Sequence, residues 1–188
     1  MPNVQELAAP IKMVLMDVDG VLTDGRLYNV PDAAGNMVET KAFDSQDGIG
    51  LQWLHWKGIK TGLISGRDSP ATAERAKQCK FVYVYQGHIE KIPILEEILA
   101  DAKLEKQQVA YIGDDLTDIV VMHRVGLAIA TANARSEVKQ EAHYVTSAPG
   151  GSGAVREVVE LLLKAQGSWD EILRKYEVPS AQSHRIGF

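Results

Sequence analysis

Residues 12–25 read KMVLMDVDGVLTDG, and this stretch decides the fold. Its apolar run is typical of a buried strand, because the run is short and ends abruptly in acidic residues and glycine. Asp17 and Asp19 therefore stand where the predicted strand passes into a loop. In parallel sheets, ligands bind beyond the carboxyl ends of the strands, so these two carboxylates are the first candidates for a functional site.

The rest of the chain alternates between strand-like and helix-like segments. The predicted strands after the first are IKTGLISG, FVYVY, VAYIGDD, LAIA and YVT, and helical patterns separate them. Such alternation predicts an α/β fold with a doubly wound, Rossmann-like parallel sheet that helices cover on both faces. Residues 27–43, LYNVPDAAGNMVETKAF, depart from this pattern. Two extended pieces flank turn-forming residues there, which predicts a projecting β-hairpin.

Length and composition restrict the class of protein. The 188 residues fit one domain, with residues 1–166 as the folded unit and residues 167–188 as a C-terminal tail. The net charge of -5 argues against broad nucleic-acid binding, which needs a basic face. We expect no membrane segment, since no apolar run approaches the roughly 20 residues that span a bilayer. The single cysteine, Cys79, fits a reduced, cytoplasmic environment.

Three later strand ends also carry polar or charged side chains. They contribute Ser65-Gly66-Arg67 after the second strand of the sheet, Lys91 after the third, and Gly113-Asp114-Asp115 after the fourth, with Asp118 one helical turn further on. A lone serine or acidic pair at such a place is usually a turn or a helix cap. The four groups together, on successive strands, indicate a single site for chemistry on phosphate.

This set suits magnesium-dependent hydrolysis of a phosphomonoester. Because a phosphate dianion repels a carboxylate nucleophile, a divalent cation must screen it, and Mg²⁺ prefers oxygen ligands. Asp17 and Asp114 are the expected carboxylate ligands, with a backbone carbonyl at Asp19. Asp17 is then expected to attack phosphorus and form an aspartyl-phosphate. Asp19 protonates the leaving alkoxide and later deprotonates the water that hydrolyses the intermediate.

The remaining polar groups have supporting roles. Ser65 is expected to donate a hydrogen bond to a phosphate oxygen, and Lys91 to neutralise phosphate charge. Asp118 is expected to orient Lys91 or a metal-bound water from outside the ligand shell, with Asp115 beside it.

The segments DVDGVLTDG, SGR, Lys91 and GDDLTD are similar to the four motifs of the haloacid dehalogenase superfamily. That resemblance implies that Asp17 is the nucleophile, Asp19 the general acid/base and Asp114 a magnesium ligand. The segments KAFDSQDGIG, ISGRDS, VGLAIATANA and GGSGAVREVVELLLKAQG further resemble one family within it. Its members hydrolyse the phosphate ester of an eight-carbon sugar acid, 3-deoxy-D-manno-octulosonate 8-phosphate, in lipopolysaccharide biosynthesis.

The closer resemblance also implies a set of substrate contacts. They fall on Asp19, Asp44, Ser45, Gln46, Asp47, Gly48, Gly66, Arg67, Arg75 and Lys91. Arg67 matters most, because a guanidinium group pairs with the carboxylate of a sugar acid in a bidentate way. Gln52 departs from the basic residue that some members carry there. Arg75 has an alternative interpretation as a surface helix residue that pairs with a nearby acid.

The spacing of the motifs leaves no room for the cap domain that many superfamily members insert over the site. The segments from Asp19 to Ser65 and from Ser65 to Lys91 are already filled by predicted elements. Because an open site is poor for stabilising charge, we expect the hairpin of one subunit to cover a neighbour's site. The resemblance implies a homotetramer with hairpin and tail contacts between subunits. The alternative is a hairpin that folds over its own edge.

Other functions remain as alternatives. A phosphatase for a nine-carbon sugar acid or another sugar phosphate would use the same motifs. A receiver domain also combines an aspartate, a hydroxyl, a lysine and magnesium, but its acidic pair precedes the phosphorylated aspartate on a separate strand. A catalytically idle structural or signalling homologue is disfavoured because every catalytic position is intact. Gly150, Gly151 and Gly153 lack a phosphate-loop pattern and predict a mobile link to the last long helix.

Overall fold

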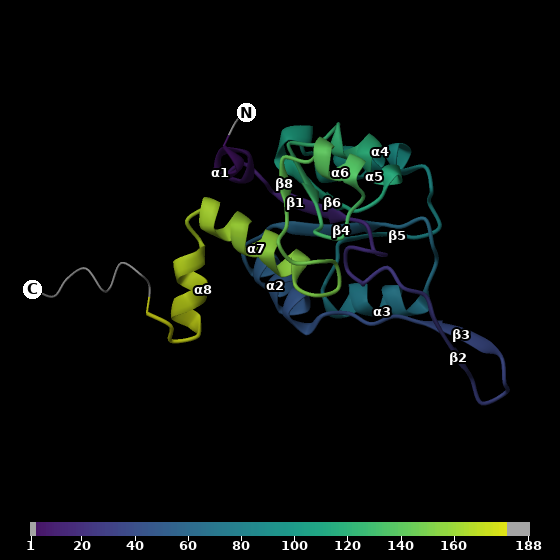
Figure 1. The fold of residues 1–188 in the computed structure, drawn as a ribbon. Coiled ribbons are helices and arrows are strands. Elements are labelled where there is room, and N and C mark those ends of the chain that lie inside the picture. The colour runs from purple at the N-terminus through teal and green to yellow at the C-terminus, as the bar shows by residue number, and fades with distance from the viewer. Residues whose placement is uncertain (1–2, 180–188) are drawn as a thin grey trace, which may run out of the picture.

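A six-stranded sheet forms the centre of the molecule, in a computed structural model that describes residues 3–179 (Figure 1). All its strands are parallel, in the order β5-β4-β1-β6-β7-β8. The strands are β1 (Met13–Met16), β4 (Lys60–Ile64), β5 (Tyr83–Tyr85), β6 (Val109–Gly113), β7 (Leu127–Ala130) and β8 (Tyr144–Val145). Each predicted sheet strand is present, so the doubly wound α/β prediction is confirmed.

Helices cover both faces of the sheet. They are α1 (Val4–Ala8), α2 (Ser45–Trp56), α3 (Pro70–Gln78), α4 (Lys91–Ala102), α5 (Leu116–Met122), α6 (Ser136–Glu141), α7 (Ala154–Ala165) and α8 (Trp169–Lys175). Figure 1 shows α4, α5 and α6 on one face, with α2, α3 and α7 on the other. A short 3-10 helix, η1 (Lys106–Gln108), leads into β6.

Strand β1 explains why two hydrophobic cores form. Its side chains alternate, so Val14 and Met16 join the core under α2 and α7, whereas Met13 and Leu15 join the core under α4 and α5. All four are almost fully buried. A strand buried on both faces reads as a continuous apolar run, which is the pattern the sequence shows.

The position of β1 in the sheet also sets the position of the site. β1 lies between β4 and β6, and Met16 pairs in register with Leu63 and Ile112. The residues that follow these three strands therefore emerge side by side at one edge of the sheet. Asp17 and Asp114 come from two of these adjacent strand ends.

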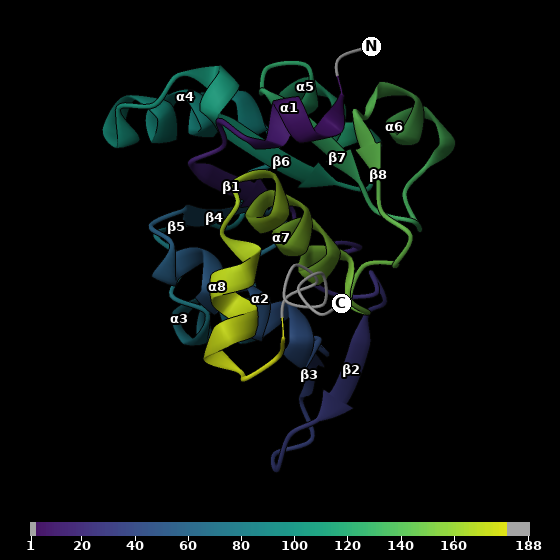
Figure 2. The same ribbon diagram turned by 90° about the vertical axis from the view of Figure 1, so that its left-hand side faces the viewer.

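The predicted hairpin is present as a separate two-stranded antiparallel sheet. Strands β2 (Tyr28–Pro31) and β3 (Met37–Thr40) project from the body of the molecule in both views (Figures 1 and 2). Asp32 closes the turn by accepting hydrogen bonds from the backbone amides of Ala34 and Asn36. Within residues 3–179 no cap domain is inserted between the motifs, in agreement with the spacing argument.

The glycine-rich segment before α7 differs from its prediction as a mobile link. A Cβ atom on Gly150 would lie 2.0 Å from the carbonyl oxygen of Gly20, and Gly151 has a φ of +66° against the backbone of Thr23. The amide of Gly150 also donates to Asn133 Oδ1 at 2.6 Å. The glycines are therefore needed for close packing against the loop after β1, because any side chain there would collide with that loop.

The first part of the C-terminal tail is ordered helix. The ring of Trp169, at the start of α8, meets Trp53 of α2 edge-on with centroids 5.7 Å apart. Trp53 Nε1 donates to the hydroxyl of Tyr176 at 3.1 Å, just after α8. The expected contact between tails and neighbouring sites falls largely on residues 180–188, which lie outside the described residues.

Candidate active site

A cavity of about 350 Å³ opens at the edge of the sheet where β1, β4 and β6 end. Its walls combine acidic, basic and hydroxyl side chains with glycine backbone. They are formed by Asp17, Asp19, Gly25, Ser65, Gly66, Arg67, Ile89, Lys91, Asp114, Asp115 and Thr117. The four groups predicted from separate strand ends are therefore brought together in one cavity.

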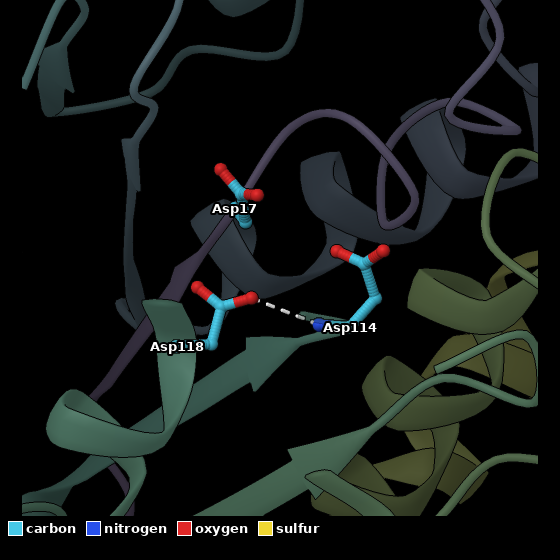
Figure 3. A group of neighbouring side chains, drawn as sticks. All are labelled: Asp17, Asp114 and Asp118. Atoms are coloured by element: carbon cyan, nitrogen blue, oxygen red, sulfur yellow. Dashed lines mark hydrogen bonds between the residues drawn. The ribbon is translucent and has the colours of Figure 1, made fainter. Parts of the chain in front are cut away.

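Three carboxylates form what we call the acidic cluster: Asp17, Asp114 and Asp118. One oxygen from each lies within 4.8 Å of the others (Figure 3). Asp17 follows β1, Asp114 follows β6, and Asp118 comes from the first turn of α5. Lys91, the first residue of α4, places Nζ 3.1 Å from Asp17 Oδ1 and 2.7 Å from Asp118 Oδ1. The acidic cluster thus contains one ammonium group, which contacts two of its three carboxylates.

Asp118 is fully buried, and its two oxygens already accept four hydrogen bonds. Oδ1 accepts from Lys91 Nζ and from the Tyr111 hydroxyl, both at 2.7 Å. Oδ2 accepts from the backbone amide of Asp114 at 2.9 Å (Figure 3) and from that of Asp115 at 3.2 Å. This leaves no lone pair free for a metal ion. The geometry agrees with a supporting role for Asp118, while Asp17 and Asp114 keep oxygens available.

The raised pKa values in the acidic cluster indicate that a further cation would stabilise its ionised carboxylates. Burial, and then the charge of Asp118, raise the pKa of Asp17 to about 6 despite the nearby Lys91. The same two causes raise the pKa of Asp114 to about 8. Burial works against the charged form of Lys91, but attraction to Asp118 and Asp17 leaves its pKa raised. Carboxylates that resist ionisation in this way are expected where positive charge is missing.

A divalent cation fits these residues. Asp114 Oδ1 is buried and accepts no hydrogen bond from residues 3–179. Two negative charges remain when three ionised carboxylates face one ammonium, and a doubly charged ion would neutralise them. Carboxylate oxygens at a strand end are suitable ligands for a hard cation. Asp17 and Asp114 are the residues that could hold it.

A second group of charges, which we call the paired cluster, lies across the cavity. It consists of Asp19, Glu39, Lys41 and Arg67. Lys41 Nζ forms an ion pair with Asp19 Oδ1 and lies 3.3 Å from Glu39 Oε1. Arg67 forms an ion pair with Glu39 and places Nε 3.7 Å from Asp19 Oδ2. Two carboxylates here meet two cations.

Sequence reasoning missed Glu39 and Lys41. Both lie on or just after β3, at the base of the hairpin, so this part of the hairpin folds back on its own site while the rest projects away. The Lys41 side chain is only 2% exposed. No motif marks Glu39. Lys41 is the first residue of the segment KAFDSQDGIG, but that resemblance alone assigned it no role, and the other available signal was a Glu-x-Lys pair in a segment predicted to be extended.

Ser65 is placed as the sequence predicted. It follows β4, is 3% exposed, and its hydroxyl oxygen accepts a hydrogen bond from the amide of Arg67 at 3.2 Å. Because that contact uses a lone pair, the hydroxyl hydrogen stays available to a phosphate oxygen. Asp115, by contrast, is exposed and caps α5 by accepting from Leu116 N at 2.7 Å.

The residues from Asp44 to Gly48 and Arg75 do not line the cavity of the single chain. Asp44 caps α2 by accepting from the amides of Gln46 and Asp47. Arg75 donates to the carbonyl of Asp44 at 2.6 Å, so it pairs with backbone and not with an acid. Their substrate contacts stay a prediction, as does any contact through Gln52 on α2.

Asp47 holds two helices together. Its side chain is 1% exposed, and Oδ1 accepts from the amide of Arg156 in the first turn of α7 at 2.7 Å. Burial raises the pKa of Asp47 to about 6. This contact ties the start of α2 to the start of α7, next to the glycine segment that supports the loop after β1.

The cavity and the acidic cluster define a class of protein before any relative is considered: a phosphate-handling α/β hydrolase. A family model described as haloacid dehalogenase-like hydrolase matches residues 70–157. The chain is 40% identical over 170 residues to the 3-deoxy-D-manno-octulosonate 8-phosphate phosphatase KdsC of Salmonella typhimurium, covering 90% of this chain and 88% of the relative. It is 42% identical over 165 residues to the Yersinia pestis KdsC, covering 87% and 86%.

Solved structures agree with these relatives. One is a crystal structure of 3-deoxy-D-manno-octulosonate 8-phosphate phosphatase from Moraxella catarrhalis in complex with magnesium ion, phosphate ion and KDO. It is 38% identical, has a TM-score of 0.86, and the match covers 92% of this chain and 97% of that one. The chain therefore belongs to the 3-deoxy-D-manno-octulosonate 8-phosphate phosphatase family of haloacid dehalogenase-like hydrolases. None of the helices in residues 3–179 combines the length and hydrophobicity that crossing a membrane requires.

Proposed function

We propose that this chain hydrolyses 3-deoxy-D-manno-octulosonate 8-phosphate to the free sugar acid and phosphate, with Mg²⁺ as cofactor. The observation that carries the proposal is the acidic cluster, where burial and then surplus negative charge raise the pKa values of Asp17 and Asp114. Identities near 40% with curated phosphatases over most of the chain supply the substrate. The Moraxella catarrhalis relative, crystallised with magnesium, phosphate and KDO, supports the same cofactor and product.

In this mechanism Asp17 attacks phosphorus in line and forms an aspartyl-phosphate. Magnesium, held by Asp17, Asp114 and the backbone carbonyl of Asp19, supplies the positive charge that a phosphate dianion needs. Ser65 donates a hydrogen bond to a phosphate oxygen. Lys91, oriented by Asp118 at 2.7 Å, neutralises a second oxygen.

Proton transfer is assigned to Asp19. It lines the cavity two residues after Asp17, close enough in the chain to serve the same phosphorus. Its carboxyl group gives a proton to the leaving alkoxide, and its carboxylate then removes a proton from the water that attacks the aspartyl-phosphate. Hydrolysis of this acyl phosphate releases phosphate and restores Asp17.

Recognition of the sugar acid is assigned to Arg67. Its side chain is 47% exposed on the cavity wall, and its guanidinium already binds a carboxylate, that of Glu39. A substrate carboxylate would make the same kind of pair. The predicted contacts from Asp44 to Gly48 and from Arg75 would complete the sugar pocket. A nine-carbon sugar acid phosphate is the alternative substrate.

The assembly we propose is a homotetramer in which the hairpin of one subunit covers the site of another. Two observations support it. The cavity has no cap within residues 3–179, and the projecting hairpin exposes a group of apolar side chains: Leu27, Tyr28, Val30, Met37 and Val38. Light scattering tests this arrangement, and a fully active monomer would contradict it.

The experiment that tests the function is a phosphate-release assay with Mg²⁺. It compares 3-deoxy-D-manno-octulosonate 8-phosphate with sugar phosphates that have no carboxylate. We expect a strong preference for the sugar acid, which chelation of the metal removes. Equal activity on all of these compounds would support a general sugar phosphatase and contradict the assignment of 3-deoxy-D-manno-octulosonate 8-phosphate as the specific substrate. Absence of activity on every member would favour the idle homologue.

A further inference from the structure

Lys41 is a buried ammonium group at the base of the hairpin, immediately after β3. Only 2% of its side chain is exposed, and Nζ forms an ion pair with Asp19 Oδ1. A lysine so deeply buried is costly unless its charge is paired, so this contact has a reason to be maintained. The partner is the residue to which proton transfer is assigned.

We propose that Lys41 is a positioning residue that fixes which oxygen of Asp19 carries the proton. The inference rests on the proposed phosphatase reaction and adds a residue to it. An ammonium group has three donors and no acceptor, so the carboxyl oxygen facing it must accept and cannot itself be protonated toward it. Because Lys41 holds Oδ1, the proton of Asp19 belongs on Oδ2.

The surroundings of Oδ2 agree with this assignment. It is buried and accepts no hydrogen bond from residues 3–179, and Arg67 Nε lies 3.7 Å from it. The Asp19 carboxyl group, which belongs to a residue that lines the cavity, therefore has one oxygen fixed by a buried cation and one buried oxygen without a hydrogen bond. Proton transfer needs a carboxyl group held in one orientation, because a rotating group spends time misaligned.

Glu39 keeps Lys41 in place. Its Oε1 lies 3.3 Å from Lys41 Nζ, and its other oxygen is bound by Arg67. Burial works against the charged form of Glu39, but the hydrogen bond from Arg67 and the charge of Lys41 leave its pKa lowered. The base of the hairpin thus joins the proton donor to the arginine proposed to bind the sugar acid.

The test is the dependence of kcat/KM on the leaving group in Lys41→Met, which removes the charge but keeps a chain of similar length. A sugar phosphate leaves as an alkoxide and needs the proton, whereas p-nitrophenyl phosphate releases a stable phenolate and does not. We expect a loss of roughly 100-fold on the sugar phosphate and less than about 5-fold on the aryl ester. Lys41→Arg, which keeps a cation, should recover part of the selective loss.

Lys77→Met is the matched control, since Lys77 is an exposed lysine on α3, away from the cavity lining. It should leave both substrates unaffected. In an Asp19→Asn background, Lys41→Met should add little further loss, because the carboxyl group it positions is gone. Equal losses of kcat/KM on both substrates, or none on either, would overturn the proposal.

Two further points keep this test separate from others. If Lys41→Met does not fold, Lys41→Gln keeps a donor at similar length and should show the same selectivity with a smaller loss. If the sugar acid is the wrong substrate, the alkyl and aryl comparison is made with the sugar phosphate that the wild type hydrolyses best. The role of Lys41 can therefore be tested even if the named sugar acid is not the substrate.

Discussion

The two charged clusters at the cavity differ in balance. The acidic cluster has three carboxylates and one ammonium group, whereas the paired cluster has two of each sign. In the first, burial and then the charge of Asp118 raise the pKa values of Asp17 and Asp114. In the second, pairing with Arg67 and Lys41 outweighs burial and lowers the pKa of Glu39. The surplus charge is suited to a metal ion, while the balanced group is suited to holding side chains in place.

The largest expected effect comes from removing the proposed nucleophile. Asp17→Asn keeps the shape of the side chain but cannot form the acyl phosphate, so kcat should fall by roughly 10⁴-fold or more. The fold should survive, because the change removes one of three mutually repelling charges. Phosphate release and circular dichroism measure both points. A variant that keeps substantial turnover would mean that another group attacks phosphorus.

Arg67→Ala should produce a smaller and selective loss. We expect kcat/KM for the sugar acid phosphate to fall about 100-fold, as for loss of a charge-assisted, bidentate contact. Turnover of p-nitrophenyl phosphate, which has no carboxylate, should fall far less. Arg67→Lys is the matched variant, since it keeps the charge without the bidentate geometry. Equal losses of kcat/KM on both substrates would contradict the proposal that Arg67 binds the substrate carboxylate.

The acidic cluster should make the metal-free protein less stable as pH rises. The folded pKa values of Asp17 and Asp114, about 6 and about 8, lie above the ordinary value of 3.8. Their contribution to stability is therefore complete below pH 3.8 and is lost as pH rises toward 8. Asp114→Asn removes most of this dependence, so its melting temperature at pH 9 should exceed that of the wild type, by on the order of 5 °C. If the melting temperatures of wild type and Asp114→Asn changed with pH in the same way, the proposed surplus of negative charge in the acidic cluster would be contradicted.

The paired cluster should show the opposite pH dependence, with a smaller effect. Because the folded pKa of Glu39 is lowered, its contribution is present above its ordinary pKa of 4.5 and is lost as pH falls. Glu39→Gln should lower the melting temperature by about 2 °C at pH 7, since the site is partly exposed to solvent. The difference from wild type should close in acid. If the difference in melting temperature between wild type and Glu39→Gln grew as pH fell, the ionised Glu39 carboxylate would not be what stabilises the paired cluster.

The parallel sheet, and the polar residues that follow its strands, could be predicted from the sequence alone. An apolar run followed by Asp17-Val18-Asp19 predicts both a buried strand and the edge to which it delivers its carboxylates. The parallel order then brings Asp114 and Ser65 to the same edge, because neighbouring strands end together. These are local patterns joined by one general rule of topology.

The parts that sequence could not give depend on contacts between distant segments. Lys41 meets Asp19 only because the hairpin returns to the sheet, and no periodicity marks that return. The sequence around Gly150 is typical of a flexible link. In the structure a glycine is required there, because a side chain would collide with the carbonyl oxygen of Gly20. For Asp118 the sequence predicted a supporting role but could not show which groups it contacts. Its four hydrogen bonds, two from backbone amides, favour the supporting role.

The most direct test of the difference between the clusters is calorimetric titration of the metal-free protein with Mg²⁺ at pH 7, in buffers of different ionisation enthalpy. Because the metal-free Asp114 carboxyl group is mostly protonated at that pH, binding should release roughly one proton per ion. Asp114→Asn should bind much more weakly without that release, while Glu39→Gln should bind like the wild type. Magnesium binding that releases no proton, or that is lost equally in both variants, would contradict the account.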